Sequence, residues 1–155
     1  MNITEITRVK KQINGRSRLA PYCRVSSDSA DQLHYFAAQI RYYSEYAKNH
    51  PEYELADIYA DEGITGTEMK KRDELNRLIT DCKKGKVDRV IVKSVSRLAR
   101  NTEELLVLLR LFKDLGVSVY FEEQGIDTEK LNMEMIVTFP GMATANGTMV
   151  RLDIS

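Results

Sequence analysis

The strongest constraint on the fold is a regular alternation of short strand-like runs with longer segments of helical periodicity. The strand-like runs lie at about residues 18–25, 53–60, 87–92 and 117–122. The third run contains Val90-Ile91-Val92, a continuous β-branched stretch that is typical of a strand buried on both faces. The order β-α-β-α-β-α-β predicts an α/β fold in which a mostly parallel sheet of four to five strands carries helices on both faces.

The segments between the strands predict three helices. The first covers about residues 31–48, and its apolar residues recur at helical spacing, so we expect a buried stripe. That stripe consists of Leu33, Phe36, Ala37, Ile40, Tyr43 and Ala47. The stripe of the second helix consists of Leu75, Leu78, Ile79 and Cys82. Gly85 stands where the second helix should end. The third helix runs from Asn101 to about Lys113, and Asn101 with Glu104 resembles a capping box.

The length of 155 residues predicts one domain with short extensions. We expect a flexible basic arm over residues 1–18, an α/β domain over residues 19–128 and a C-terminal helical segment over residues 129–155. Pro140-Gly141 should kink or stop the helix of that last segment.

The composition bounds the class of protein. Lys and Arg number 23, and so do Asp and Glu, which argues against nucleic-acid binding through bulk charge alone. Cys23 and Cys82 lie far apart without metal-ligand spacing, as expected of small core residues in a reducing compartment. No apolar run approaches the ~20 residues that span a bilayer, and the N-terminus lacks an apolar signal core. We therefore expect a cytoplasmic protein with no membrane partner.

The first strand stops abruptly at a hydroxyl, in Tyr22-Cys23-Arg24-Val25-Ser26. Residues two apart in a strand point to the same face, so Arg24 and Ser26 should project together. Ligands of parallel sheets bind beyond the carboxyl ends of the strands, which here carry Ser26, Asp61, Lys93 and Glu122. The simpler alternative is that Ser26 caps the next helix and Arg24 is an ordinary surface cation.

Several kinds of site are disfavoured. Neither GxGxxG nor GxxxxGK[ST] occurs, so the two common nucleotide-binding loops of α/β folds are absent. His34 and His50 fall on a helix surface and before a proline, so neither is placed as a general base for Ser26, and a Ser-His-Asp triad is not expected. A metal-dependent hydrolase remains an alternative, and its ligands would be Asp61, Glu62 and Asp88.

What remains is a serine with arginines around it. Arg97 and Arg100 are three residues apart and would share a face if their segment is helical, and Arg72 follows a glycine-containing loop. The planar fork of arginine binds phosphate oxygens bidentately. Several guanidinium groups around a hydroxyl could activate it and offset the charge that develops on a reacting phosphate. The alternative is that these arginines are solvated surface groups.

Five motifs, in order and at matching spacing, resemble the catalytic domain of the serine site-specific recombinases, the resolvase/invertase family. They are Tyr22–Ser26 followed by Gln39, Tyr59–Gly66, Arg72, Lys93–Asn101, and Gly125–Thr128. The resemblance covers about residues 19–136 and is closest to the large members, the phage integrases and conjugative-transposon recombinases.

The resemblance implies a mechanism. Ser26 would attack a DNA phosphodiester to give a 5′-phosphoserine link and a free 3′-hydroxyl, and the strands would be rejoined after exchange, as in DNA integration or excision. The residues that would hold and activate the phosphate are Arg24, Arg97 and Arg100. Residues that would support the site are Arg72, Gln39, Asp61 and Asp88. No cofactor or metal is implied.

The implied partners are double-stranded DNA, further copies of the chain in a dimer or tetramer, and an accessory directionality protein. Ser96 departs from the family, since many members have Asp there, and the breaks at Pro140-Gly141 and Asn146-Gly147 interrupt the expected oligomerisation helix. We expect a catalytic fragment without the DNA-binding region, and a gap between Ser26 and Arg97 too long for a direct hydrogen bond without DNA. A non-catalytic assembly or regulatory module of the same fold is the alternative.

Overall fold

The computed structural model describes residues 15–26, 29–63 and 72–132, with the side chains of residues 26–32 and 63 left out. Its strands are β1 (Ser17–Ser26), β2 (Tyr53–Leu55), β3 (Tyr59–Gly63), β4 (Arg89–Val92), β5 (Ser118–Phe121) and β6 (Ile126–Asp127). Its helices are α2 (Ser29–Asn49), α3 (Asp73–Lys83), α4 (Val95–Leu98) and α5 (Thr102–Asp114), with a 3-10 turn η1 (Thr128–Lys130). The described residues contain one sheet in the order β2-β1-β4-β5-β6. Strand β3 also pairs with β1, closer to its carboxyl end than β2 does. Only the β5–β6 pair within this sheet is antiparallel.

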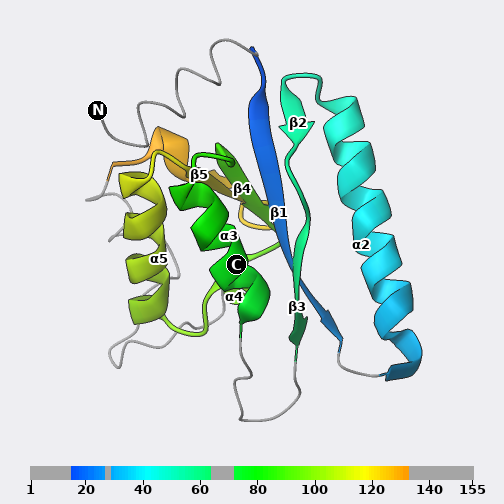
Figure 1. Cartoon of the computed structure of the whole chain (residues 1–155). Helices are drawn as coiled ribbons and strands as arrows, with labels where there is room; N and C mark the ends of the chain where they lie inside the picture. Colours follow the sequence, from blue (N-terminus) through cyan, green and yellow to red (C-terminus); the bar gives the residue numbers. More distant parts are fainter. Residues whose placement is uncertain (1–14, 27–28, 64–71, 133–155) are drawn as a thin grey trace.

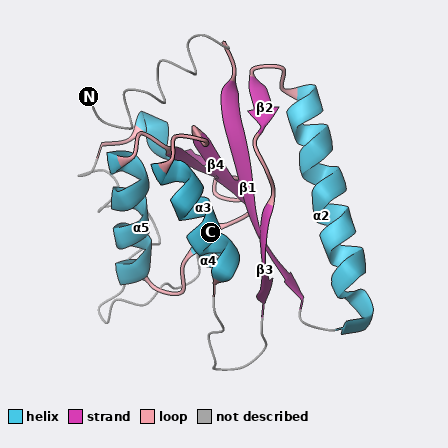
Figure 2. Ribbon diagram, in the orientation of Figure 1, coloured by secondary structure: helices cyan, strands magenta, loops and turns pink. Residues whose placement is uncertain are grey.

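Helices cover both faces of the sheet, which confirms the predicted fold class, although the described residues form six strands rather than the expected four to five. Helix α2 lies on one side of β1, and α3 and α5 lie on the other (Figure 1, Figure 2). The larger buried cluster lies under α3 and α5, and a smaller one lies under α2. Val90 and Val92 belong to the first cluster and Ile91 to the second, so β4 is buried on both faces as its sequence predicts.

The expected single strand over residues 53–60 is two strands, and this break explains how a proline fits in a central strand. Both β2 and β3 pair with the same edge of β1. The Leu19 carbonyl accepts from the Ala56 N–H on that edge, whereas the Arg18 carbonyl accepts from the Asp88 N–H on the other. Pro21 is two residues after Leu19, so its backbone nitrogen faces the same edge of β1. Proline has no N–H to donate, but this edge is interrupted between β2 and β3, so no hydrogen bond of the sheet is lost there.

The stripe predicted on the second helix is confirmed. Leu75, Leu78 and Cys82 are buried and Ile79 is partly buried against them. Gly85 has a φ of 76° just after the end of α3, in the left-handed region that glycine adopts without strain.

The stripe predicted on the first helix is mostly wrong. Tyr43 is 1% exposed, but Leu33 is 79% exposed, and Phe36 and Ile40 also face solvent. The buried contacts of α2 come from its C-terminal half, through Tyr43 and the partly buried Tyr46. Helical periodicity identifies the apolar face of a helix but does not identify an element to cover it.

The two cysteines are free and buried, as predicted for core residues. Burial raises the pKa of each thiol to about 12, so both are neutral near pH 7. In the described part of the chain, no helix has both the length and the apolar character needed to cross a bilayer. The helix predicted beyond residue 132, including its break at Pro140, lies outside the described residues.

Candidate active site

The carboxyl ends of β1, β3, β4 and β5 meet at one end of the sheet, which we call the carboxyl edge. The Cα partners across β1 and β3 are Arg24 with Asp61 and Ser26 with Gly63. Tyr22 packs in the cluster under α3 and α5, whereas Cys23 packs under α2. Arg24, two residues beyond Tyr22, is therefore on the α3 and α5 side, and Ser26 has the next position of the same register. The Ser26 hydroxyl, and with it the expected gap to Arg97, lies outside the described side chains.

Arg72 connects three elements beside this strand. Its Nη2 donates to the Tyr22 hydroxyl at 3.1 Å and to the Leu98 carbonyl at 2.5 Å, and its Nη1 donates to Glu104 Oε1 at 3.2 Å. The guanidinium also lies over the Tyr22 ring, 5.5 Å from its centroid. The Arg72 side chain is only 12% exposed. Its partners in β1, α4 and α5 therefore fix its orientation.

Asp61 supports this arrangement through Tyr22. The Tyr22 hydroxyl donates to Asp61 Oδ2 at 2.6 Å while it accepts from Arg72. Asp61 also accepts from the backbone N–H groups of Glu74 and Leu75 at 2.9 and 3.0 Å, so it caps the first turn of α3 from a distance. Burial raises the pKa of Tyr22, against the opposing charge of Arg72, so the hydroxyl keeps the proton that it donates.

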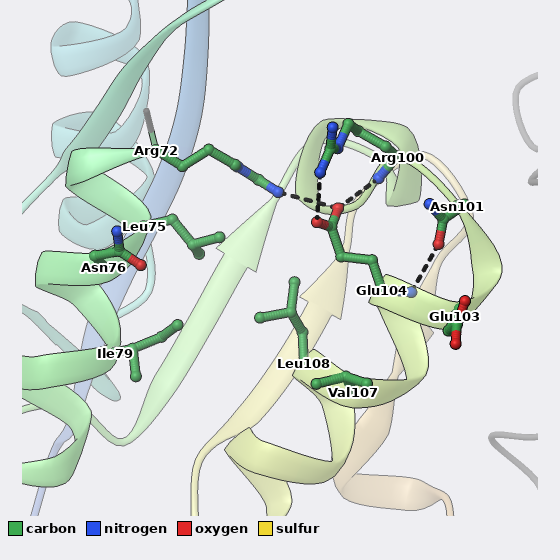
Figure 3. Close-up of a pocket in the computed structure, with 10 residues that line it drawn as sticks. All are labelled: Arg72, Leu75, Asn76, Ile79, Arg100, Asn101, Glu103, Glu104, Val107 and Leu108. Carbon is green, nitrogen blue, oxygen red and sulfur yellow. Dashed lines mark hydrogen bonds and ion pairs between the residues drawn. The ribbon is translucent and has the colours of Figure 1, made fainter. Parts of the chain in front are cut away.

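Arg97 and Arg100 are not on one helix, which corrects the expectation of a shared helical face. Helix α4 ends at Leu98, and Ala99 is extended, with φ of −137° and ψ of 152°. Arg97 is exposed at the end of α4. Arg100 turns toward α5, where its backbone N–H donates to Glu104 Oε1 at 2.8 Å and its Nη2 donates to Oε2 at 3.4 Å (Figure 3).

The capping box predicted for α5 forms in part. Asn101 is the N-cap, and its side chain accepts from the Glu104 N–H at 2.8 Å. The carboxylate of Glu104 does not return to the N-cap backbone but bonds the N–H of Arg100, one residue earlier. Glu104 thereby becomes a shared partner of Arg72 and Arg100.

Two predicted supporting residues lie apart from this group. Gln39 is half-buried on α2, on the other face of the sheet from Arg72. Asp88 lies at the amino end of β4, where its carboxylate accepts three N–H groups of Arg18 at 2.9 Å each. Arg18 is near the start of β1, whereas Ser26 ends that strand. This position favours a structural role for Asp88 over a role at Ser26.

A second cluster lies at the carboxyl edge on the α2 face. Glu122 accepts from the hydroxyls of Tyr42 and Tyr43 at 2.6 and 2.7 Å, and Lys93 Nζ lies 5.3 Å from the Tyr42 ring centroid. The hydrogen bond to Glu122, with burial, raises the pKa of Tyr42 to about 12. Burial and the same carboxylate raise the pKa of Tyr43. These contacts join α2 to the ends of β4 and β5.

The alternative chemistries gain no support from the geometry. His50 bonds the Tyr46 carbonyl through Nδ1 at 2.7 Å and stacks on the Tyr46 ring, just before β2, which pairs with the amino end of β1. Of the acids invoked as metal ligands, Asp61 caps α3 and Asp88 lies at the opposite end of the sheet from Ser26. Within residues 15–26, 29–63 and 72–132, no three or more His, Cys, Asp or Glu side chains are grouped to hold a metal ion.

Sequence reasoning missed the roles of Tyr22 and Glu104. Tyr22 is assigned no role from the sequence, although its two-residue spacing from Arg24 puts both residues on one face of β1. Glu104 counted only as a helix cap. Its position four residues after Arg100 could have indicated an ion pair with that arginine. Its contact with Arg72 joins residues that are 32 positions apart in the sequence, so no local pattern indicates it.

The comparisons with known proteins agree with this geometry. Residues 19–147 match the family model described as "Resolvase, N terminal domain". A "Resolvase/recombinase" of Pseudomonas putida is 35% identical over 81 residues, which are 52% of this chain and 42% of that protein. The match therefore spans less than half the length of this curated relative.

Solved structures with the same fold include recombinase domains. A resolvase family site-specific recombinase from Streptococcus pneumoniae is 32% identical, with a TM-score of 0.64 and coverage of 79% of this chain and 83% of that one. The N-terminal catalytic domain of TP901-1 integrase is 26% identical, with a TM-score of 0.60 and coverage of 78% and 88%. The C-terminal catalytic domain of ISC1926 TnpA, an IS607-like serine recombinase, is 28% identical, with a TM-score of 0.55 and coverage of 67% and 68%. Because the family model matches most of the sequence, the chain belongs to the resolvase family through its resolvase N-terminal domain.

Proposed function

We propose that this chain is the catalytic domain of a site-specific DNA recombinase in which Ser26 is the nucleophile. The observation that carries the proposal is the placement of Arg72. Its guanidinium is held by hydrogen bonds to Tyr22, Leu98 and Glu104. It lies on the face of β1 that also carries Arg24, and β1 is the strand that ends at Ser26. Family membership and similarity to recombinase catalytic domains support the same assignment.

The reaction is a phosphoryl transfer that conserves the energy of the DNA backbone. The Ser26 oxygen forms a bond to phosphorus while the bond from phosphorus to the 3′-oxygen breaks. The serine proton is lost, the leaving 3′-oxygen gains a proton, and a 5′-phosphoserine ester remains. Attack of a 3′-hydroxyl on that ester reverses the step and rejoins the strands without an external energy source.

The arginines supply positive charge to the reacting phosphate. Arg97 and Arg100 are exposed after β4, and Arg24 is half-buried at the end of β1, so we propose that these three contact the DNA backbone directly. Arg72, Asp61 and Tyr22 support them, because Arg72 is largely buried and already bonded to the protein. Gln39 and Asp88 are assigned no contact with the phosphate.

The proposed partners follow from this activity. Double-stranded DNA is the substrate, and strand exchange requires further copies of the chain as a dimer or tetramer, with an accessory directionality protein to select integration or excision. The near-zero net charge argues against DNA binding through bulk charge alone, so we propose that the local arginines supply the contacts with the DNA backbone. The free, buried cysteines are consistent with action in the reducing cytoplasm.

The test is formation of a covalent protein–DNA complex by the full-length protein that contains this chain. With DNA that carries the recombination site, we expect an adduct that survives denaturing electrophoresis, forms in the presence of EDTA and is absent with Ser26→Ala. Ser29→Ala is the matched control, since it removes a hydroxyl three residues on and should leave the adduct intact. An adduct that persists in Ser26→Ala would contradict the proposal. Loss of adduct formation with EDTA would favour metal-dependent cleavage instead, and no adduct with any variant would favour a non-catalytic module.

A further inference from the structure

The groove between α3 and α5 joins an apolar lining to a charged end. It has a volume of about 560 Å³, and its apolar lining includes Leu75, Ile79 and Leu108. At the other end, the side chains of Arg72 and Arg100 converge on Glu104 from opposite sides (Figure 3). A single carboxylate therefore serves two arginines of the candidate active site.

The two carboxylate oxygens of Glu104 make hydrogen bonds of different length. Oε1 accepts from the Arg100 backbone N–H at 2.8 Å and from Arg72 Nη1 at 3.2 Å, so it fixes the turn before α5. Oε2 accepts from Arg100 Nη2 at 3.4 Å, which is longer than a strong charge-assisted hydrogen bond. The Arg100 side chain is 50% exposed, and ion pairs at such positions contribute little free energy. The backbone contact is therefore firm, and the contact with the Arg100 guanidinium is easily exchanged.

A phosphate can replace the weaker contact without disturbing the firmer one. Carboxylate and phosphate oxygens present similar acceptor geometry to the fork of a guanidinium. When Arg100 Nη2 exchanges Oε2 for an oxygen of a phosphate, Oε1 can keep its bonds to the Arg100 N–H and to Arg72. Only the Arg100 side chain then has to move.

We propose that Glu104 is a positioning residue that holds the Arg100 guanidinium beside α5 until an oxyanion of the DNA backbone takes the place of its Oε2. This inference rests on the proposed function, because it identifies the oxyanion as the phosphate that Arg100 contacts. In the DNA-free chain, the Glu104 carboxylate balances the positive charge of Arg100. The DNA backbone therefore has to compete with this carboxylate for the guanidinium. Other anions must compete with the same carboxylate.

Sulfate titration of this chain at constant ionic strength tests the exchange, with the Arg100 Nε–Hε resonance as the reporter. Glu104→Gln keeps an oxygen for the Arg100 N–H but removes the competing charge. We expect it to lower the apparent Kd for sulfate at Arg100 about fivefold, the change expected for losing one exposed ion-pair contact. Glu103→Gln removes the same charge from the neighbouring exposed residue and should change the Kd by less than about twofold at physiological salt.

A second measurement uses the unaltered chain and does not depend on the folding of a variant. As sulfate saturates Arg100, the carboxyl carbon resonance of Glu104 should move with the same midpoint, and that of Glu103 should not. Equal effects of the two Gln variants, or a Glu104 resonance that stays fixed while Arg100 saturates, would overturn the proposal.

The two proposals can fail separately. If the Ser26 adduct forms but the Gln variants behave alike in sulfate, the role of Glu104 is refuted and the recombinase function stands. If the titrations follow the expected pattern but no variant of the full-length protein forms an adduct, anion exchange at Arg100 stands and the recombinase function fails.

Discussion

Removal of one hydroxyl, by Tyr22→Phe, tests the network that holds Arg72. Tyr22 is 1% exposed, and its hydroxyl donates to a carboxylate at 2.6 Å and accepts from a guanidinium at 3.1 Å. A hydrogen bond to a charged group contributes about 1.5–3 kcal/mol. In Tyr22→Phe, Asp61 still accepts from two backbone N–H groups, and Arg72 still donates to the Leu98 carbonyl. We therefore expect the free energy of unfolding to fall by about 2 kcal/mol, which is less than the sum of the two lost hydrogen bonds.

Urea unfolding of this chain, followed by circular dichroism, measures the loss as a fall in midpoint of about 1 M. The rate of adduct formation by the full-length protein should also fall at least about tenfold, because Arg72 loses one of its anchors and misplaced groups cost rate steeply.

Tyr59→Phe is the matched control for Tyr22→Phe. Tyr59 is also 1% exposed, and its hydroxyl donates to Asp81 at 2.7 Å, outside the Arg72 network. It should lower stability by a similar amount and leave the adduct rate of the folded protein unchanged. A Tyr22→Phe chain within about 0.5 kcal/mol of the original, or an equal loss of rate in both variants, would refute the reasoning.

Two further predictions concern contacts away from Arg72. Asp88→Asn should lower the free energy of unfolding by about 3 kcal/mol in urea, because it leaves the largely buried charge of Arg18 unpaired, and the folded fraction should keep its adduct rate. The pKa of Tyr43 is raised by burial and by Glu122, so its neutral form contributes stability that is present below about pH 10 and lost as the pH rises above that value. Tyr43→Phe should therefore flatten the fall in stability above pH 10, by up to about 1.4 kcal/mol per pH unit in urea titrations, and an unchanged slope would contradict this assignment.

The sequence predicted the sheet because its signals are local. The continuous run Val90–Val92 needs burial on both faces, and the stripe of α3 from Leu75 to Cys82 needs one covered face; both are met within the larger core. The same argument failed for α2, where Leu33 is exposed, because periodicity identifies an apolar face but not its partner.

The candidate site was predictable in its parts but not in its connections. Arg24 and Ser26 follow from strand alternation, and the arginines from their chemistry. The links from Arg72 to Tyr22 and Glu104 join residues 50 and 32 positions apart, and such long-range contacts leave no local pattern. The prediction that Arg97 and Arg100 share a helical face was wrong, because α4 ends at Leu98 and Ala99 is extended. The guanidinium of Arg100 therefore donates to Glu104.

Mass spectrometry of the trapped protein–DNA adduct tests the central claim most directly. The full-length protein would be incubated with site DNA in EDTA, denatured and digested, and the peptide that carries the nucleotide would be sequenced. We predict one modified peptide, with a 5′-phosphate esterified to Ser26. A nucleotide on any other residue, or free 5′-phosphate ends with no modified peptide, would contradict the account.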